Sequence, residues 1–210
     1  MKPLPNIDQI IVINLCKRVD RWTEICHEFN RLEIPLDQVT RLEGFETPEF
    51  GTLGCTISHA YAIQSAYNKK YNYTLILEDD FNFRAKTREE LDKQLEAVWT
   101  SKFDVFHFGQ NPIKISDEVY DFNNMKIRRS IDTQTASGYL VRYGYLPEIK
   151  KVLTSSIGPL QVTGQHWIYA CDQIWKSLQQ CDKWFYLEPS LGYQRESFSD
   201  NSQSVANYEL

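Results

Sequence analysis

Short apolar runs alternate with helical patterns along this chain. The run at residues 10–13 is β-branched throughout, which is typical of a strand buried on both faces of a sheet. Further strands are predicted at residues 39–42, 73–77, 103–108, 135–141 and 184–187. Apolar residues at helical spacing predict helices near residues 22–32, 56–68, 87–99, 146–153 and 168–178. This order predicts an α/β fold with a mainly parallel central sheet flanked by helices.

Two parts of the pattern need more detail. Gly51 and Gly54 precede the helix predicted at residues 56–68, and we expect them to form a turn with unusual backbone angles. The core-facing residues of that helix are predicted to be Ile57, Ala60, Tyr61 and Tyr67. The polar stretch 111–131 is predicted as a loop with short strands. No repeat or long linker divides the chain, so a single domain over residues 1–210 is expected.

Composition narrows the functional class and the compartment. The 210 residues include 23 Lys and Arg against 28 Asp and Glu, a net charge of −5, which disfavours general binding to nucleic acid. The five cysteines are scattered and form no CxxC motif, so neither a zinc knuckle nor a redox pair is indicated. The chain shows no signal peptide and no apolar run long enough to span a membrane. A cytoplasmic protein with reduced thiols is therefore expected.

The sharpest local feature is a strand that runs directly into three carboxylates, Glu78, Asp79 and Asp80. Burying adjacent carboxylates is costly, and each raises the pKa of the others unless a cation compensates. A hard divalent cation prefers oxygen ligands, and strand geometry would place Glu78 and Asp80 on the same side. A metal site and a solvated strand end are about equally consistent with this trio alone.

Two other segments could border a ligand. Residues 14–21 join the first predicted strand to the first helix and contain Arg18 and Arg21, so a phosphate there would meet cations and a helix N-terminus. Taken alone, that segment is better explained by ordinary surface ion pairs of Asp20 with Arg18 or Arg21. Ser58 and His59 lie early in the next helix. On its own, His59 is better explained as a partly buried, hydrogen-bonded histidine than as a ligand-binding residue.

Taken in order, these segments resemble glycosyltransferase family 25, which contains lipopolysaccharide and procollagen galactosyltransferases. The likeness rests on Ile11 to Leu15 with Arg18 and Arg21, Gly54-Cys55 with Ser58-His59, and Leu77 to Asp80. Phe103 to Val105 with Phe108-Gly109, Gly138 to Val141, Asp172, Pro189, Gln194 and Ser199-Asp200 resemble later family motifs. The sequence departs from the family at Thr52, where an acidic residue is usual, and at His107, where an apolar or tyrosyl residue is usual.

The resemblance implies a single-domain GT-A-like fold and a metal-dependent glycosyltransferase. A hexose, galactose or glucose, would pass from a UDP-sugar to a hydroxyl of a glycan, lipopolysaccharide-type or protein acceptor, with inversion. Glu78 and Asp80 would bind Mn²⁺ or Mg²⁺. The donor would contact Asn14, Leu15, Arg18, Arg21, Ser58, His59, Asp79 and Gln194. Asp172 is the first candidate for the catalytic base and His166 the second.

The same resemblance divides the chain into a nucleotide-binding part at about residues 8–110, an acceptor-side part at about 111–200 and a flexible tail at about 201–210.

Aromatic residues are concentrated in the last quarter of the chain: Trp167, Tyr169, Trp175, Trp184, Tyr186 and Tyr193. We expect some of them to form a wall of the donor or acceptor site and core packing to explain the rest. Two other classes stay open, a non-catalytic sugar- or nucleotide-binding protein and, less favoured, a nucleotidyl- or phosphotransferase.

Overall fold

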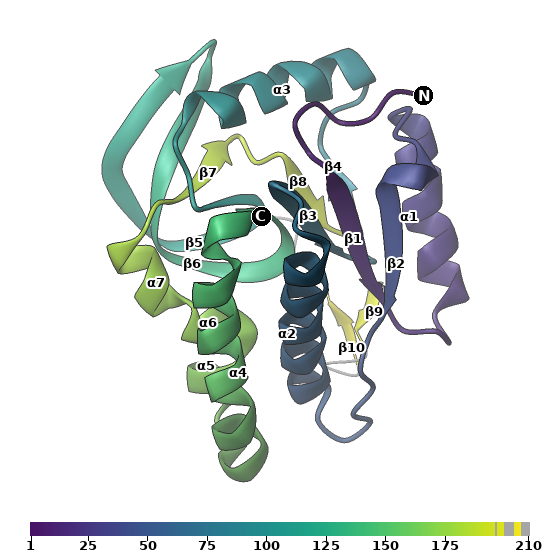
Figure 1. The fold of residues 1–210 in the computed structure, drawn as a ribbon, viewed down its shortest axis with the longest axis vertical. Helices are drawn as coiled ribbons and strands as arrows, with labels where there is room; N and C mark the ends of the chain where they lie inside the picture. Colours follow the sequence, from purple (N-terminus) through teal and green to yellow (C-terminus); the bar gives the residue numbers. More distant parts are fainter. Residues whose placement is uncertain (196, 200–203, 207–210) are drawn as a thin grey trace.

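The computed structural model describes residues 1–195, 197–199 and 204–206. Its centre is a six-stranded sheet with strand order β2-β1-β3-β6-β5-β7, flanked by helices (Figure 1). The sheet strands are β1 (Gln9–Asn14), β2 (Val39–Glu43), β3 (Tyr73–Glu78), β5 (Val105–Phe122), β6 (Met125–Arg142) and β7 (Trp184–Glu188). Because β6 alone runs antiparallel to its neighbours, the other five strands point the same way. The predicted α/β class with a mainly parallel sheet is confirmed.

The remaining elements are short strands, two 3-10 turns and the helices. The helices are α1 (Val19–Arg31), α2 (Gly51–Lys69), α3 (Arg88–Thr100), α4 (Leu146–Thr163), α5 (His166–Tyr169), α6 (Cys171–Ile174) and α7 (Lys176–Cys181). Turns η1 (Leu36–Gln38) and η2 (Tyr143–Tyr145) precede β2 and α4. Strands β4 (Phe81–Phe83) and β8 (Gly192–Gln194) pair with each other, as do β9 (Ser197–Ser199) and β10 (Ser204–Ala206).

The two faces of the sheet bury separate apolar cores. Successive residues of β1 alternate between them: Ile10 and Val12 pack with α1 and α3, whereas Ile11 packs with α2, α4 and α6. The continuous apolar run of β1 is thus explained by burial on both faces. Figure 1 shows α2 and α4 side by side over one face. Most of the predicted functional side chains gather at the carboxyl ends of β1, β2 and β3.

The structure corrects the prediction for residues 111–131. This stretch is not a loop with short strands but most of a long hairpin in which β5 and β6 pair antiparallel. The turn falls at Asn123 and Asn124, which both have positive φ, as two-residue hairpin turns require. Several register shifts interrupt the pairing. These shifts interrupt the alternation of polar and apolar residues that would have indicated strands.

Three further predictions are wrong in detail. The stretch 168–178 is not one helix, because α5, α6 and α7 divide it. In α2 the core-facing residues include Leu53, Ala62, Ile63 and Ala66, while Tyr61 is 49% exposed and Tyr67 39% exposed. The glycines expected to form a turn before this helix lie inside its first turns, and neither Gly51 nor Gly54 has positive φ.

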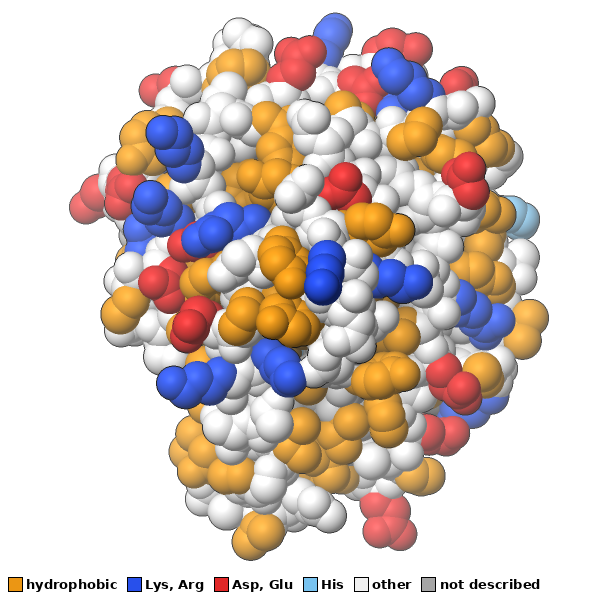
Figure 2. Space-filling view, in the orientation of Figure 1, with side chains coloured by type: hydrophobic (Ala, Val, Ile, Leu, Met, Phe, Trp, Pro, Cys, Tyr) orange, Lys and Arg blue, Asp and Glu red, His pale blue; other side chains and the backbone are white. Residues whose placement is uncertain are grey.

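On the face drawn in Figure 2, Lys and Arg side chains are scattered among acidic and uncharged ones and form no continuous stripe. Within the described part of the chain, no helix is long and apolar enough to cross a membrane. The tail predicted at residues 201–210 lies outside the described residues, except for 204–206 in β10.

A buried phenylalanine anchors the chain just after the three carboxylates. The ring of Phe81 lies against two glycines of other strands, Gly138 in β6 and Gly192 in β8. A Cβ on Gly138 would lie 2.7 Å from the Phe81 ring, and a Cβ on Gly192 would overlap it. Because both positions lack a side chain, the ring of Phe81 fits against them, and this packing anchors the residue that follows Asp80.

His107 is a buried polar residue in the core of β5. Its ring is fully buried against Trp175 and Trp184, with centroid distances of 5.8 and 5.4 Å. Neither ring nitrogen has a hydrogen-bond partner among the described residues. Burial lowers the pKa of His107 to about 3, so the folded protein holds this imidazole neutral.

His107→Phe should raise the free energy of unfolding, and more so in acid. Between the folded pKa of about 3 and the unfolded value near 6.5, the unfolded chain binds a proton that the folded chain does not. The native His107 should therefore cost about 2 kcal/mol of stability between pH 8 and pH 5. Urea unfolding of both proteins at the two pH values measures this. A gain independent of pH, or the same pH effect in exposed His166→Gln, would contradict the assignment.

Candidate active site

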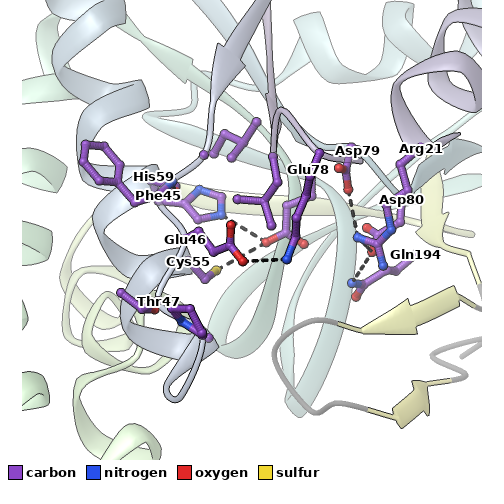
Figure 3. Close-up of a pocket in the computed structure, with 17 residues that line it drawn as sticks. Arg21, Phe45, Glu46, Thr47, Cys55, His59, Glu78, Asp79, Asp80 and Gln194 are labelled. Carbon is purple, nitrogen blue, oxygen red and sulfur yellow. Dashed lines mark hydrogen bonds and ion pairs between the residues drawn. The ribbon is translucent and has the colours of Figure 1, made fainter. Parts of the chain in front are cut away.

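A cavity of about 420 Å³ opens at the carboxyl ends of β1, β2 and β3, where ligands bind in open α/β sheets. Its wall is formed by the ends of these strands, the loop between β2 and α2, the first turns of α2, and Gln194 of β8 (Figure 3). Eight of the predicted site residues line it: Leu15, Arg21, Ser58, His59, Glu78, Asp79, Asp80 and Gln194. Predictions made from separate segments thus converge on one cavity.

Arg21 of α1 is shared by two of the three carboxylates. Its Nη1 lies 2.9 Å from Asp79 Oδ1 and 3.2 Å from Asp80 Oδ2, and all three side chains are at least nine-tenths buried. Asp79 also accepts a hydrogen bond of 2.6 Å from Asn14 Nδ2. Burial raises the pKa of Asp79, and Arg21 and Asn14 oppose that rise. A protein cation therefore compensates part of the acidic charge.

Glu78 faces the opposite side of the cavity, toward α2. Its Oε1 lies 3.1 Å from His59 Nε2 and accepts a hydrogen bond from Cys55 Sγ at 3.5 Å. The other ring nitrogen of His59 lies 3.1 Å from the Tyr139 hydroxyl. Burial alone would lower the pKa of His59, but the contacts with Cys55 and Glu78 reverse this and raise it to about 10. Burial likewise opposes ionisation of Glu78, yet His59 holds its pKa below the ordinary value.

Asp80 is the least compensated of the three acids. Burial, followed by repulsion from Glu78, raises its pKa to about 7 although Arg21 lies close. Its Oδ2 accepts a hydrogen bond of 3.1 Å from Gln194 Nε2. Its Oδ1 is buried and has no hydrogen-bond partner among the described residues. An unpartnered carboxylate oxygen in a buried site is what a hard cation would satisfy.

Four predicted site residues are not among the cavity-lining residues of the described chain. Asn14 is buried behind Asp79, and Arg18 pairs with Asp20 beside the first helix. Asp172 is the second residue of α6, where its Oδ2 accepts a hydrogen bond from the Thr135 backbone N–H at 3.2 Å. His166 lies exposed in α5 with its ring against Trp167.

Half of the six late aromatic residues are core. Trp175, Trp184 and Tyr186 are buried, and within the described chain none of the six predicted residues lines the 420 Å³ cavity. Trp167 is 61% exposed. The aromatic ring in the cavity wall is Phe45, which packs edge-on against Tyr61 at 5.7 Å. Core packing therefore accounts for half of this cluster.

The loop between β2 and α2 was not predicted to form part of the site. Phe45, Glu46, Thr47 and Pro48 all line the cavity, and Lys17 Nζ pairs with Glu46 Oε1 across it at 2.6 Å. Ser58 Oγ holds the loop by accepting from the Phe45 backbone N–H and donating to the Gly54 carbonyl, both at 2.7 Å. Most of residues 44–50 are polar or turn-forming and follow a predicted strand, so the sequence does indicate a loop at the end of that strand.

The comparisons with known proteins agree with the resemblance. The model for glycosyltransferase family 25 (LPS biosynthesis protein) matches residues 49–146, a segment that contains α2, β3 and the three carboxylates. The resemblance is thereby confirmed over this segment, and the match supports a glycosyltransferase. No curated protein matches the chain.

Several solved structures are similar in fold. A197 from STIV is 12% identical, covering 85% of this chain and 81% of its own, with a TM-score of 0.44. A glycosyltransferase involved in glycosylation of the major capsid of PBCV-1 is 10% identical, with coverages of 93% and 95% and a TM-score of 0.48. S. aureus TarS 1-349 in complex with UDP-GlcNAc is 13% identical, with coverages of 96% and 54% and a TM-score of 0.43. At these scores they assign no ligand to this chain.

Gly54→Ala should displace the loop that walls the cavity. A Cβ at this position would overlap the Phe45 carbonyl oxygen and lie 2.7 Å from Thr47 Oγ1. We expect a loss of about 1–3 kcal/mol in the free energy of unfolding. Gly158→Ala in α4 is the matched control, because a Cβ there meets nothing within 4 Å; it should stabilise by about 0.5–1 kcal/mol. Equal effects in denaturant unfolding would refute the close contact.

Proposed function

We propose that the protein is a glycosyltransferase that transfers a hexose, galactose or glucose, from a UDP-sugar to a hydroxyl of a glycan, lipopolysaccharide-type or protein acceptor, with inversion. The observation that carries the proposal is the cavity at the strand ends, lined by Glu78, Asp79 and Asp80 within the segment matched by the family model. In this proposal residues of about 8–110 bind the nucleotide and residues of about 111–200 face the acceptor.

A divalent cation fits the carboxylates. The cavity wall holds four carboxylates, of Glu46, Glu78, Asp79 and Asp80, against the cations Lys17 and Arg21 and the histidine His59. A diphosphate would add further negative charge, and the buried Asp80 Oδ1 has no partner among the described residues. We therefore assign Glu78 and Asp80 to Mn²⁺ or Mg²⁺. Such an ion supplies Lewis-acid stabilisation of a leaving nucleoside diphosphate.

The other side chains orient the donor. Arg21 holds Asp79 and Asp80 in place and lies where it can contact a phosphate. Leu15, Ser58 and His59 line the same cavity, and Gln194 reaches it from β8. Asn14 acts through Asp79, and we place Arg18 at the outer margin of the donor site. Together they fix the sugar for a single displacement.

Inversion requires one base to accept the proton of the acceptor hydroxyl. We assign Asp172 to this role and keep His166 as the second candidate. Asp172 follows Cys171, whose backbone N–H donates to Thr56 Oγ1 of α2 at 3.2 Å. This contact seats the start of α6 beside the cavity wall.

Asp80→Asn should lower donor turnover about 100-fold or more, because several kcal/mol of charge stabilisation would be lost. Donor hydrolysis is measured over UDP-Gal, UDP-Glc and UDP-GlcNAc with Mn²⁺ and with EDTA. The matched control is Asp37→Asn, an exposed acid before β2. Hydrolysis at the wild-type rate in Asp80→Asn would remove the metal assignment. No turnover of any donor by the wild type, with UDP binding retained, would favour a non-catalytic binder.

Asp172→Asn should lower kcat about 100-fold or more while UDP affinity stays unchanged, as loss of a general base predicts. His166→Gln, made in parallel, distinguishes the two candidates, because only one substitution should have this effect. The pH dependence of kcat for both variants and the wild type completes the test. Normal turnover in a folded Asp172→Asn protein would exclude Asp172 as the base.

A further inference from the structure

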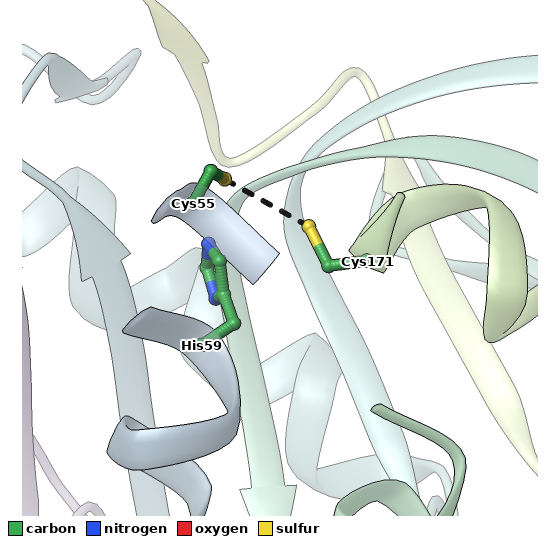
Figure 4. A group of neighbouring side chains, drawn as sticks. All are labelled: Cys55, His59 and Cys171. Carbon is green, nitrogen blue, oxygen red and sulfur yellow. Dashed lines mark hydrogen bonds between the residues drawn. The ribbon is translucent and has the colours of Figure 1, made fainter. Parts of the chain in front are cut away.

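Two cysteines and a histidine from distant parts of the chain meet beside the cavity. Cys55 and His59 belong to α2, and Cys171 begins α6 (Figure 4). One possible ligand atom from each lies within 4.8 Å of the others. Cys55 and Cys171 are 116 positions apart, so their spacing could not indicate a site.

The distance between the two cysteine sulfurs fits a shared metal ion better than a disulfide. Cys55 Sγ and Cys171 Sγ are 3.9 Å apart. Two thiolates bound to one tetrahedral Zn²⁺ at about 2.3 Å each are separated by about 3.8 Å. A disulfide requires about 2.05 Å. The observed distance therefore matches two corners of a metal tetrahedron without movement of either side chain.

The histidine is already oriented for the same role. The Tyr139 hydroxyl, from β6, holds Nδ1 of His59 at 3.1 Å and leaves Nε2 directed toward Glu78. Histidines that bind metals are usually fixed in this way by a hydrogen bond to the second ring nitrogen. Glu78 Oε1 lies 3.1 Å from that Nε2 and 3.5 Å from Cys55 Sγ, so it stands where a fourth ligand would be.

We propose that Cys55, His59 and Cys171 bind a Zn²⁺ ion, with Glu78 Oε1 as the fourth ligand. Glu78 would then bridge two ions, binding Zn²⁺ through Oε1 and the donor-site cation through Oε2. Thiolate and imidazole are the ligands that zinc prefers, whereas a hard ion such as Mg²⁺ prefers oxygen. On binding, the two thiols and the protonated His59 each release a proton to solvent, and the ion joins α6 to α2. A zinc ion here would be structural, since four protein ligands leave no open position. The proposal does not depend on glycosyl transfer.

The test is metal binding by the full chain without any nucleotide. Protein purified with reductant and stripped with EDTA is titrated with Zn²⁺ and with Co²⁺. We expect about one equivalent of tightly bound Zn²⁺ by elemental analysis. We also expect the intense visible bands and thiolate-to-metal absorption of tetrahedral Co²⁺. Cys171→Ser should weaken Zn²⁺ binding at least about 10-fold and remove one thiolate from the spectrum.

Cys181→Ser is the matched control, because Cys181 is an exposed free thiol in α7; it should bind like the wild type. Cys55→Ser is the second variant, with circular dichroism to establish that each protein is folded. The proposal is overturned if the wild type binds no Co²⁺, or if both cluster variants give the wild-type spectrum. It is equally overturned if Cys55 and Cys171 are found as a disulfide and the reduced protein takes up no metal.

Discussion

The burial of three consecutive carboxylates at the end of β3 is the constraint around which this site is built. The polar partners of these acids come from different elements, and one of them is shared. Glu78 meets His59 of α2, Asp79 meets Asn14 at the end of β1, and Arg21 of α1 lies between Asp79 and Asp80. Truncating Arg21 would leave uncompensated buried charge, which is among the costliest single changes to a fold. The charge pattern therefore ties α1, α2 and β1 to the sheet edge.

Much of this arrangement follows from local sequence. The β-branched run of β1 and the apolar run of β3 indicate buried parallel strands, and both were predicted within one or two residues. The hydroxyl of Thr87 caps α3 by accepting a hydrogen bond from the Glu90 backbone N–H, which is a capping pattern encoded by residues close in sequence. The acidic trio marks a site because buried charge always requires an explanation. These features are readable since each depends on neighbours close along the chain.

Other features depend on contacts between distant residues. The β5–β6 hairpin escaped prediction because its register shifts break the alternation of polar and apolar positions. The meeting of Cys55 with Cys171 is set by how α6 docks on α2, which no spacing encodes. Likewise, part of the positive charge beside the acids comes from Arg21 of α1, 58 residues before Asp79 in the chain. Pairing of specific side chains is a tertiary property, and here it decides the chemistry.

The seat of Phe81 has a consequence for how sequences of this fold can diverge. Its ring fills the space that side chains at Gly138 and Gly192 would occupy, so the three positions share one fixed volume. A methyl group gained at either glycine requires a smaller residue at position 81. A larger residue at a glycine alone would clash with the Phe81 ring, and a smaller residue at position 81 alone would leave a void. Substitutions there should therefore accumulate in compensated pairs. Relatives of this chain would then show covariation among positions 81, 138 and 192, the first of which directly follows the acids.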